Sequence, residues 1–573
     1  MKKIVYLLLF SLMVSLHTQA IQPIRKTWPV TQSDGTVINV YRHGNGFVAY
    51  FTSTDRKILV KNEQGDLCYA LLEDGKLVAS KYIAHEPALR TSEEKAFLEA
   101  NDVASRMGEV KREKANVLRR LPNRLTKAST EDGLGRYMQS GLGAVNSIGT
   151  KRLPVIMAEF SDTKFKSTTT IEKMSRYYNE AGYHDEANTV GSVRDYFISQ
   201  SRGIFQPTFD VVAKVTLDKN YRYYGRNNSY GDVNLEQFVE DAVKKAIAQG
   251  VDFNQYKDAD GKIPLVSVLY AGKGEATTNN DDLLWPAQFD YESDANIGGF
   301  HFNGAFVGNE LDDNGSLMGM GVFCHEFGHA LGLPDFYCTD GSYEGDNAFG
   351  NWSIMDTGAY VYGGNAPVGY NAYERSYLGW LNIPEIQDTA LVTLTPHTNG
   401  QGTLAVLIRN PQDTKEYFIF ENRYPGTWYP NLLYGEDFGS GLLLTHVTYN
   451  ANQWDNNILN NKQTKKRAYV VTADGSSLDY NAPESTLYGN GNNQILNLDL
   501  FDGTEYSDAP IYNITKKSDG SITFTFKTAT AIQHIETRNS QPVTNVYYDL
   551  QGRRVQNPTR GIYIKDGKKM IVK

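Results

Sequence analysis

The residues best suited to chemistry stand together in His-Glu-Phe-Gly-His-Ala-Leu-Gly-Leu-Pro-Asp, positions 325–335. His325 and His329 are spaced i and i+4, so on an α-helix both imidazoles lie on one face and can reach one metal ion. Glu326 follows the first histidine and is suited to take a proton from a water held by that metal. A catalytic zinc uses three protein ligands and keeps its fourth position for water, so the two histidines need one more.

The residues after this helix indicate where the third ligand comes from. Gly332 can adopt the left-handed conformation that ends a helix, and Pro334 cannot continue one, so we expect the chain to turn back after Leu331. That return brings Asp335 towards the metal as the third ligand. The alternative is a surface helix that carries His-Glu-x-x-His by chance, and the glycine and the acid weigh against it.

The elements that must position this motif show in the periodicity of the chain. Apolar residues at helical spacing from 235 to 247 predict an amphipathic helix closed by Gly250, and 265–270 predicts a strand. Beyond residue 385 the pattern alternates, which predicts strands at 391–394, 404–408, 417–422, 442–447 and 468–471. We therefore expect a β-rich region after the part that carries the motif.

The extended motif resembles the immune inhibitor A family of secreted metalloproteases, a metzincin-like group in which the third ligand is Asp. The likeness continues at 155–162, 192–205 and 367–380, and it covers most of the span from 150 to 530. The resemblance implies Zn²⁺ as the cofactor and protein or peptide substrates. It also implies that Met355, in Gly-Asn-Trp-Ser-Ile-Met-Asp-Thr-Gly at 350–358, forms a hydrophobic floor beneath the ligands.

Accessory roles are open for two further sets of residues. A tyrosine after Met355 could help zinc to stabilise the substrate oxyanion, and the sequence does not separate the three candidates, which are also plausible packing residues: Tyr360, Tyr362 and Tyr370. Asp258 and Asp260, in Asp-Ala-Asp-Gly, look like a remnant of a loop that binds Ca²⁺, with a plain β-turn as the alternative. We expect His446, in an apolar strand, to be a core residue.

Length, leader and charge limit the class of protein. A chain of 573 residues with 40% hydrophobic content is expected to form several domains. The first twenty residues, with Lys2, Lys3, an apolar run and Ala20, are typical of a secretory signal peptide, and the run is too short for a membrane span. We therefore expect no transmembrane segment and a protein that is secreted or attached to the cell surface. A net charge of −9 without a basic stripe argues against nucleic acid as a partner.

The expected fold class is α+β and multidomain, with a metzincin-like zinc protease domain flanked by a β-rich propeptide and a C-terminal β-sandwich. The expected boundaries are a signal peptide at 1–20, a propeptide and basic linker at 21–128, the catalytic domain at 145–388, the β-sandwich at 389–530 and a C-terminal domain at 545–573. The basic stretch at 105–128 predicts an activating cut, with a solvated linker helix as the alternative. The tail resembles the sorting domain of the type IX secretion system of Bacteroidetes, which makes that machinery an expected partner; an ordinary terminal hairpin is the alternative.

Alternatives remain open for the three cysteines. Cys68 either caps the metal in a precursor or is a buried strand residue. Cys324 and Cys338 either form a disulfide that braces the motif or remain free thiols.

Two other functions are possible alternatives to a zinc protease. The first is a binding or adhesion protein that keeps the fold without catalysis, which would have a changed Glu326 or a missing ligand. The second is a zinc hydrolase that acts on non-peptide substrates.

Overall fold

The computed structural model describes most of the chain and shows a mixed α/β protein with several sheets. The described residues are 16–19, 21–23, 26–44, 50–109, 131–228, 231–278, 280–339, 343, 346–397, 402–429, 432–433, 436–478, 484–527 and four short strands between 547 and 572. Most of the predicted leader, most of the basic stretch with its predicted activating cut, and most of the predicted sorting domain lie outside these residues. None of the helices that the structure describes is long and apolar enough to cross a membrane.

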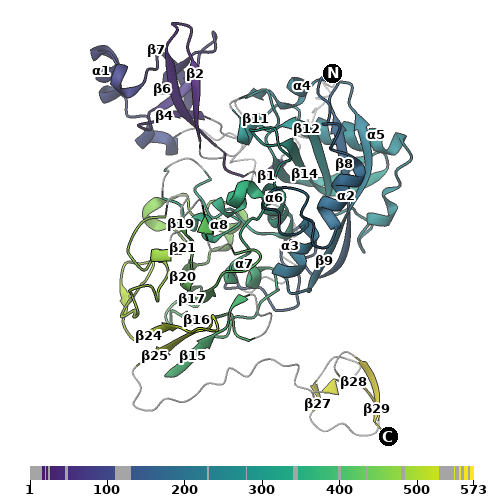
Figure 1. Ribbon diagram of the computed structural model, residues 1–573, viewed down its shortest axis with the longest axis vertical. Helices are drawn as coiled ribbons and strands as arrows, with labels where there is room; N and C mark the ends of the chain where they lie inside the picture. Colours follow the sequence, from purple (N-terminus) through teal and green to yellow (C-terminus); the bar gives the residue numbers. More distant parts are fainter. Residues whose placement is uncertain are drawn as a thin grey trace, which may run out of the picture.

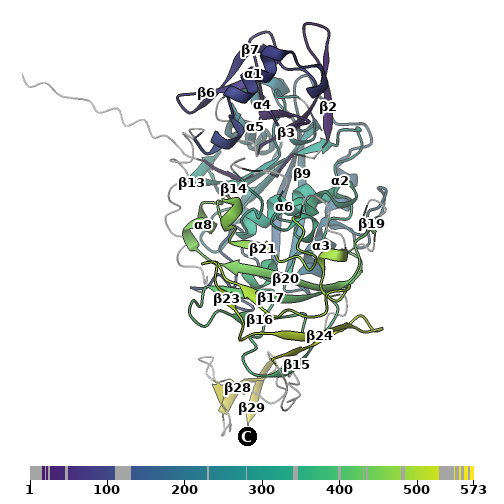
Figure 2. The ribbon, with the colours of Figure 1, turned by 90° about the vertical axis from the view of Figure 1, so that its left-hand side faces the viewer.

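An antiparallel sheet with the strands in chain order forms the N-terminal unit. Its strands are β2 (Thr27–Thr31), β3 (Val37–His43), β4 (Tyr50–Ser53), β5 (Ile58–Lys61), β6 (Leu67–Glu73) and β7 (Lys76–Ile83). Helix α1 (Ser92–Ala100) follows, and a capping box between Thr91 and Glu94 fixes its start. Figures 1 and 2 show this unit, coloured purple, at one end of the long axis.

The central sheet has the strand order β1-β13-β14-β12-β8-β9. Its strands are β1 (Leu16–Gln19), β13 (Ala287–Ile297), β14 (Phe300–Leu311), β12 (Val266–Lys273), β8 (Gly149–Glu159) and β9 (Phe205–Thr216). The four strands from β14 to β9 are parallel to one another, whereas β13 is antiparallel to β14 and β1 is antiparallel to β13. Strand β13 is therefore the one strand of this sheet that runs opposite to the others, and β1 covers it at the edge.

Both faces of this sheet are buried, as parallel strands require. One face packs against α2 (Ile171–Asn179), α3 (Val193–Gln200) and α6 (Met320–Leu331). The other face packs against α5 (Leu235–Ala248), which matches the predicted amphipathic helix. Alternate residues of β8, such as Val155 and Ile156, contribute to the two different cores.

The C-terminal β-region consists of two sheets that share one core. One sheet contains β16 (Ala405–Arg409), β17 (Glu416–Arg423), β20 (Gly441–Thr448) and β21 (Ala468–Val470); the other contains β15 (Ala390–Leu394), β25 (Ile522–Phe526) and β24 (Ile511–Lys516). Helices α7 (Ala372–Tyr377) and α8 (Ala451–Asp455) lie where this region meets the rest of the molecule, and Figure 1 shows α6 between it and the central sheet. The five strands predicted beyond residue 385 are all present.

Short elements complete the described chain. They are α4 (Tyr221–Gly225), β10 (Asn227–Asn228), β11 (Gly231–Asp232), β18 (Leu432–Leu433), β19 (Glu436–Asp437), β22 (Leu498–Asp499), β23 (Glu505–Tyr506), β26 (Tyr547–Tyr548), β27 (Arg554–Val555), β28 (Gly561–Lys565) and β29 (Lys568–Val572).

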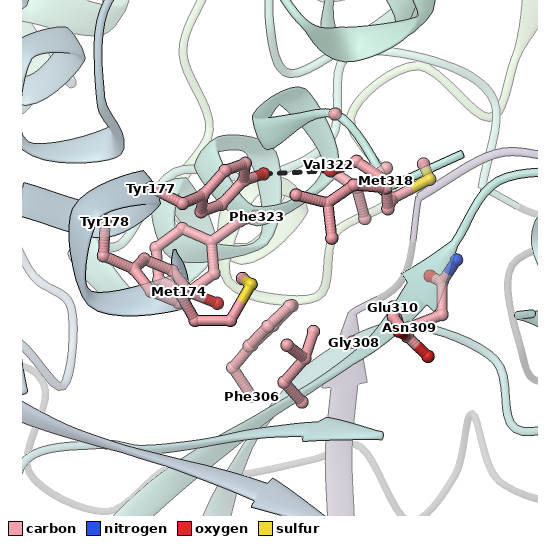
Figure 3. A pocket seen from close by; sticks show the side chains of 13 residues that line it. Met174, Tyr177, Tyr178, Phe306, Gly308, Asn309, Glu310, Met318, Val322 and Phe323 are labelled. Atoms are coloured by element: carbon pink, nitrogen blue, oxygen red, sulfur yellow. Dashed lines mark hydrogen bonds between the residues drawn. The ribbon is translucent and has the colours of Figure 1, made fainter. Parts of the chain in front are cut away.

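Helix α6 is fixed at its first turn by close packing against α2 and β14. Figure 3 shows this contact, in which the hydroxyl of Tyr177 donates to the carbonyl oxygen of Met318 at 3.1 Å. The cavity left between these side chains measures only about 20 Å³, room for a single water. This packing leaves the start of the helix little freedom to shift.

Candidate metal centre and active site

His325, His329 and Asp335 converge on one point in the interior. Nε2 of His325 lies 3.1 Å from Oδ1 of Asp335, and Nε2 of His329 lies 3.3 Å from the same oxygen. The two imidazoles are 4.8 Å apart between ring centroids. In the part of the chain that the structure describes, this is the one group of three His, Cys, Asp or Glu side chains that could hold a metal.

The turn after α6 brings Asp335 to the histidines. Gly332 ends the helix at φ 112°, a left-handed conformation, and its N–H donates to the carbonyl of His329 at 2.8 Å. A Cβ at this position would lie 2.6 Å from the backbone nitrogen of Gly143, so a side chain is excluded by space as well as by φ. Glycine at 332 is therefore required for the return of the chain.

The three converging atoms form no hydrogen bond within the described structure, although all are buried. The other polar atoms of the same side chains are already committed. Nδ1 of His325 bonds the carbonyl of Ile354 at 2.7 Å, and Nδ1 of His329 bonds the carbonyl of Leu333 at 2.8 Å. Because a carbonyl can only accept, each Nδ1 carries the proton and each Nε2 presents a lone pair.

The electrostatics of the trio favour a cation at this point. Burial lowers the pKa of His325, which keeps its imidazole neutral. Oδ1 of Asp335 faces both Nε2 atoms, at 3.1 and 3.3 Å, without a hydrogen bond to either, so three electron-rich atoms meet at one buried point. Two neutral imidazole nitrogens and one carboxylate oxygen are a donor set that suits zinc, so the residues present fit this metal.

Asn457 fixes the carboxylate of Asp335 from a distant part of the chain. Its amide Nδ2 donates to Oδ2 of Asp335 at 2.6 Å, and its Oδ1 accepts the backbone N–H of Asp335 at 2.7 Å. The first bond occupies Oδ2 of the carboxylate and leaves Oδ1 for the shared point, and the second holds the backbone of Asp335 in place. Asn457 was not predicted from the sequence, because no local pattern links it to a motif in another part of the chain.

Glu326 is buried beside the trio, with both carboxylate oxygens bound by backbone N–H groups. Oε2 accepts from Gln288 in β13 at 2.9 Å, and Oε1 accepts from Ile21 at 2.7 Å. Burial raises the pKa of this carboxyl well above its usual value, and the charge of Asp335 raises it further. The structure thus orients the residue that the sequence predicts as the general base.

The N-terminal segment of the chain lies directly over Glu326. Strand β1 pairs with the edge of β13, with Gln19 opposite Gln288. Beyond it, Ile21 is fully buried, and its carbonyl accepts the indole N–H of Trp285 at 3.1 Å. The hydroxyl of Tyr360 donates to the carbonyl of Gln22. Residues that precede the N-terminal unit therefore occupy the space around the candidate base.

Met355 packs against α6 at Gly328, the residue before His329 in the sequence. A Cβ added at Gly328 would come within 2.6 Å of Sδ of Met355, so this glycine allows the sulfur its close approach. The neighbouring carbonyl of Ile354 is the group that orients His325. The backbone N–H of Phe336 donates to the carbonyl of Met355 at 2.9 Å, which ties the turn to the chain after Asp335.

The three tyrosine candidates have different surroundings. Tyr360 contacts the N-terminal segment over the site. Tyr370 is buried under α6, where its hydroxyl donates to the carbonyl of Cys324 at 3.2 Å, and Tyr362 is a left-handed residue at φ 51°. A fourth tyrosine, Tyr337, was not predicted from the sequence; its ring is stacked on His325 at 6.4 Å between centroids. Burial raises the pKa of Tyr337 well above its usual value, and Asp335 and Glu326 add to this effect.

The remaining predicted sites have local explanations. Oδ1 of Asp258 accepts the backbone N–H groups of Asp260 and Lys262 at 3.0 and 3.1 Å, as in an ordinary turn, so binding of Ca²⁺ stays a prediction. His446 is buried and bonds Glu416 at 2.7 Å. Cys68 is a free thiol buried in β6, and Cys324 is a buried free thiol, so the disulfide between Cys324 and Cys338 is not formed.

Comparison with known proteins shows a likeness to metalloproteases over this part of the chain. Residues 150–381 match the family model described as immune inhibitor A peptidase M6, catalytic domain. The pre-pro-metalloprotease PrtV of Vibrio cholerae serotype O1 is 26% identical, over 34% of this chain and 25% of its own length. Immune inhibitor A of Bacillus thuringiensis subsp. alesti is 24% identical, over 40% of this chain and 41% of its own length. The match spans less than half of either relative.

Proposed function

We propose that the protein is a zinc-dependent endopeptidase that hydrolyses peptide bonds of extracellular proteins. The observation that carries the proposal is the convergence of three buried atoms without hydrogen bonds, on His325, His329 and Asp335, beside the carboxylate of Glu326. The match of residues 150–381 to a metallopeptidase catalytic domain supports the same activity.

His325, His329 and Asp335 would hold the ion, and Met355 would support them from below. When bound, zinc supplies a Lewis acid that lowers the pKa of a coordinated water to about 7 and polarises a peptide carbonyl. Glu326 accepts the proton of the attacking water and delivers it to the leaving amine. The N–H of Gln288 holds Oε2, which fixes the direction in which the carboxylate points.

Tyr337 and Tyr360 are the tyrosines best placed to stabilise the oxyanion of the substrate. Tyr337 stacks on His325, and Tyr360 contacts the chain segment that lies over Glu326. Tyr370 is the weakest of the candidates because its hydroxyl is bound to the backbone of α6. A phenolic hydroxyl near the trio would stabilise the negative charge that develops on the substrate oxygen during the reaction.

We also propose that the chain is made as a precursor, with a leader at 1–20 and a propeptide and basic linker at 21–128. The support is the position of Ile21 and Gln22, which exclude a substrate from Glu326 while they remain there. Secretion, and export through the type IX machinery by residues 545–573, complete the proposal and rest on the sequence patterns.

Casein is a suitable first substrate for the test. The secreted and processed protein is incubated with casein, with and without a zinc chelator, and its zinc content is measured. Cleavage that stops with the chelator and returns with added Zn²⁺ supports the proposal. Cleavage that survives removal of the zinc contradicts it, and a zinc-loaded protein without cleavage would favour the binding protein or a hydrolase of other substrates.

A further inference from the structure

An arginine of the N-terminal unit is buried against side chains of the catalytic region. Arg42, in β3, has a side chain that is only 1% exposed. Its Nη2 forms an ion pair with Glu275 and lies 2.8 Å from Oδ1 of Asp281. The guanidinium also lies over two aromatic rings, at 5.1 Å from the centroid of Phe51 and 5.6 Å from that of Trp285.

Apart from Phe51, the groups around the guanidinium belong to the catalytic region. Glu275 is fully buried, and Asn227 donates to its Oε1 at 2.6 Å. Within the described structure, the second carboxylate oxygen of Glu275 has no hydrogen-bond partner. Burial raises the pKa of the Glu275 carboxyl to about 8 and the charge of Arg42 opposes this shift, so a cation beside Glu275 favours its ionised form and the site suits a positive group.

This pocket adjoins the space that the N-terminal segment occupies. The Arg42 guanidinium lies over the indole ring of Trp285, and the indole N–H donates to the carbonyl of Ile21 at 3.1 Å. Ile21 in turn contacts Glu326. One tryptophan therefore forms a wall of the pocket and a contact of the segment over the base, so removal of the N-terminal unit opens both spaces together.

We propose that this pocket, formed by Glu275, Asp281, Asn227 and Trp285, is a substrate subsite that binds an arginine side chain once the N-terminal unit has left. The inference rests on the proposed endopeptidase function. In the precursor, Arg42 occupies the subsite in the way that a substrate arginine does later.

The surroundings favour arginine over lysine. Arg42 reaches both carboxylates through Nη2 alone, and its Nε and Nη1 have no hydrogen-bond partner among the described residues. The preference for a guanidinium therefore rests on the aromatic faces of Phe51 and Trp285, over which a flat, weakly hydrated cation lies well. Lys61 shows the contrast, because its ammonium pairs with the other oxygen of Asp281 at a site that is 36% exposed for the lysine side chain. The guanidinium side chain of Arg42, by contrast, is only 1% exposed.

The first test uses the full-length precursor and does not depend on catalysis. Arg42→Ala empties the pocket and should lower Tm, and ethylguanidinium should restore part of the loss in a saturable way, more effectively than ethylammonium. The double variant Arg42→Ala/Glu275→Gln should not respond. Equal stabilisation by the two cations, or a response that survives Glu275→Gln, would overturn the proposed arginine pocket. If Arg42→Ala does not fold, Arg42→Gln takes its place.

The second test measures where the processed enzyme cuts casein, by mass spectrometry of the products. The wild type should favour arginine at one fixed position near the cut bond, and Glu275→Gln should reduce that preference about tenfold while cuts at other sites continue. Asp282→Asn is the matched control, because this neighbouring carboxylate pairs with Arg222 at 2.8 Å outside the pocket. A site profile unchanged by Glu275→Gln would refute the subsite. If no form cleaves casein, the endopeptidase proposal fails, whereas the guanidinium test still decides the pocket.

Discussion

Asn457 forms two hydrogen bonds with Asp335, one to its carboxylate and one to its backbone N–H. The two residues are 122 positions apart in the chain. Asn457 itself has a left-handed backbone at φ 53°, a conformation that asparagine tolerates better than most residues. The third candidate ligand is therefore oriented by the segment next to α8 and not by the motif alone. Its position depends on the contact between two parts of the molecule.

Substitution of Asn457 should weaken the metal site without removing a ligand. Asn457→Ala frees the Asp335 carboxylate to rotate, and we expect zinc affinity to fall about tenfold to hundredfold. Competition with a chelator measures the affinity. Asn456→Ala is the control, because Asn456 bonds only its neighbour Asn452 at the surface. Equal affinities for the two variants would remove Asn457 from the site.

Glu326→Gln should abolish cleavage while zinc remains bound. The amide keeps the size of the side chain and cannot take a proton, so we expect the casein cleavage rate to fall about a hundredfold to ten-thousandfold. Zinc content, measured on the same preparation, should equal that of the wild type. Glu240→Gln, on the exposed face of α5, should cleave normally. A Glu326→Gln enzyme with wild-type turnover would assign the proton transfer to another group.

Gly328→Ala should destabilise the fold through Met355. The new Cβ would meet Sδ of Met355 at 2.6 Å, and overpacking of this kind costs about 1–3 kcal/mol. The expected result is a lower Tm in thermal unfolding, together with loss of activity. The double variant Gly328→Ala/Met355→Ala tests the cause, because removal of the sulfur makes room for the methyl group. Strictly additive losses in the double variant would place the strain elsewhere.

The N-terminal segment should be released more easily when Ile21 is shortened. Ile21→Ala removes buried contacts, and comparable truncations cost about 2–5 kcal/mol. The unprocessed precursor should then cleave casein faster than the wild-type precursor. Ile171→Ala is the matched control, because that isoleucine is 39% exposed. Identical basal rates for all three precursors would show that the segment does not limit access to Glu326.

Because of Asp356, the free energy of unfolding should decrease as the pH rises. Burial raises its pKa to about 7, although the N–H groups of Phe349 and Gly350 lower it. The unfolded carboxyl has a pKa of about 3.9, so between these two values the folded state holds a proton that the unfolded state has lost. The contribution of Asp356 is thus fully present below the unfolded pKa and is lost as the pH rises through the folded pKa.

Asp356→Asn removes this titration. Urea unfolding at about pH 5 and about pH 8 should show a smaller decrease in the free energy of unfolding for the variant than for the wild type. Burial also raises the pKa of Glu374 to about 7, so the variant should retain part of the decrease. A decrease as large as in the wild type would show that Asp356 does not titrate in this range.

The sequence predicted the local features of the site well. The helix spacing of His325 and His329, with the glycine at 332, was sufficient to place Asp335 near them, because a single turn joins these residues. The strands beyond residue 385 followed from alternation of apolar side chains. Such patterns are local, and the physical rules that govern them act over a few residues.

Contacts between distant segments could not be predicted in the same way. Nothing near Ile21 indicates that its N–H reaches Glu326, and Asn457 shares no pattern with the motif. Tyr337 was missed because stacking on His325 depends on the course of the chain after Asp335. In each case the contact forms only when distant parts of the chain pack together, and no short stretch of the sequence indicates it.

Every residue of α6, from Met320 to Leu331, is buried, including the histidines and Glu326. The reactive groups and the hydrophobic interior are thus carried by the same twelve residues. A substitution made here to probe catalysis also changes packing, and one made to probe packing moves a reactive group. Lost turnover in an α6 variant therefore identifies a chemical role only when its unfolding curve and metal content match those of the parent protein.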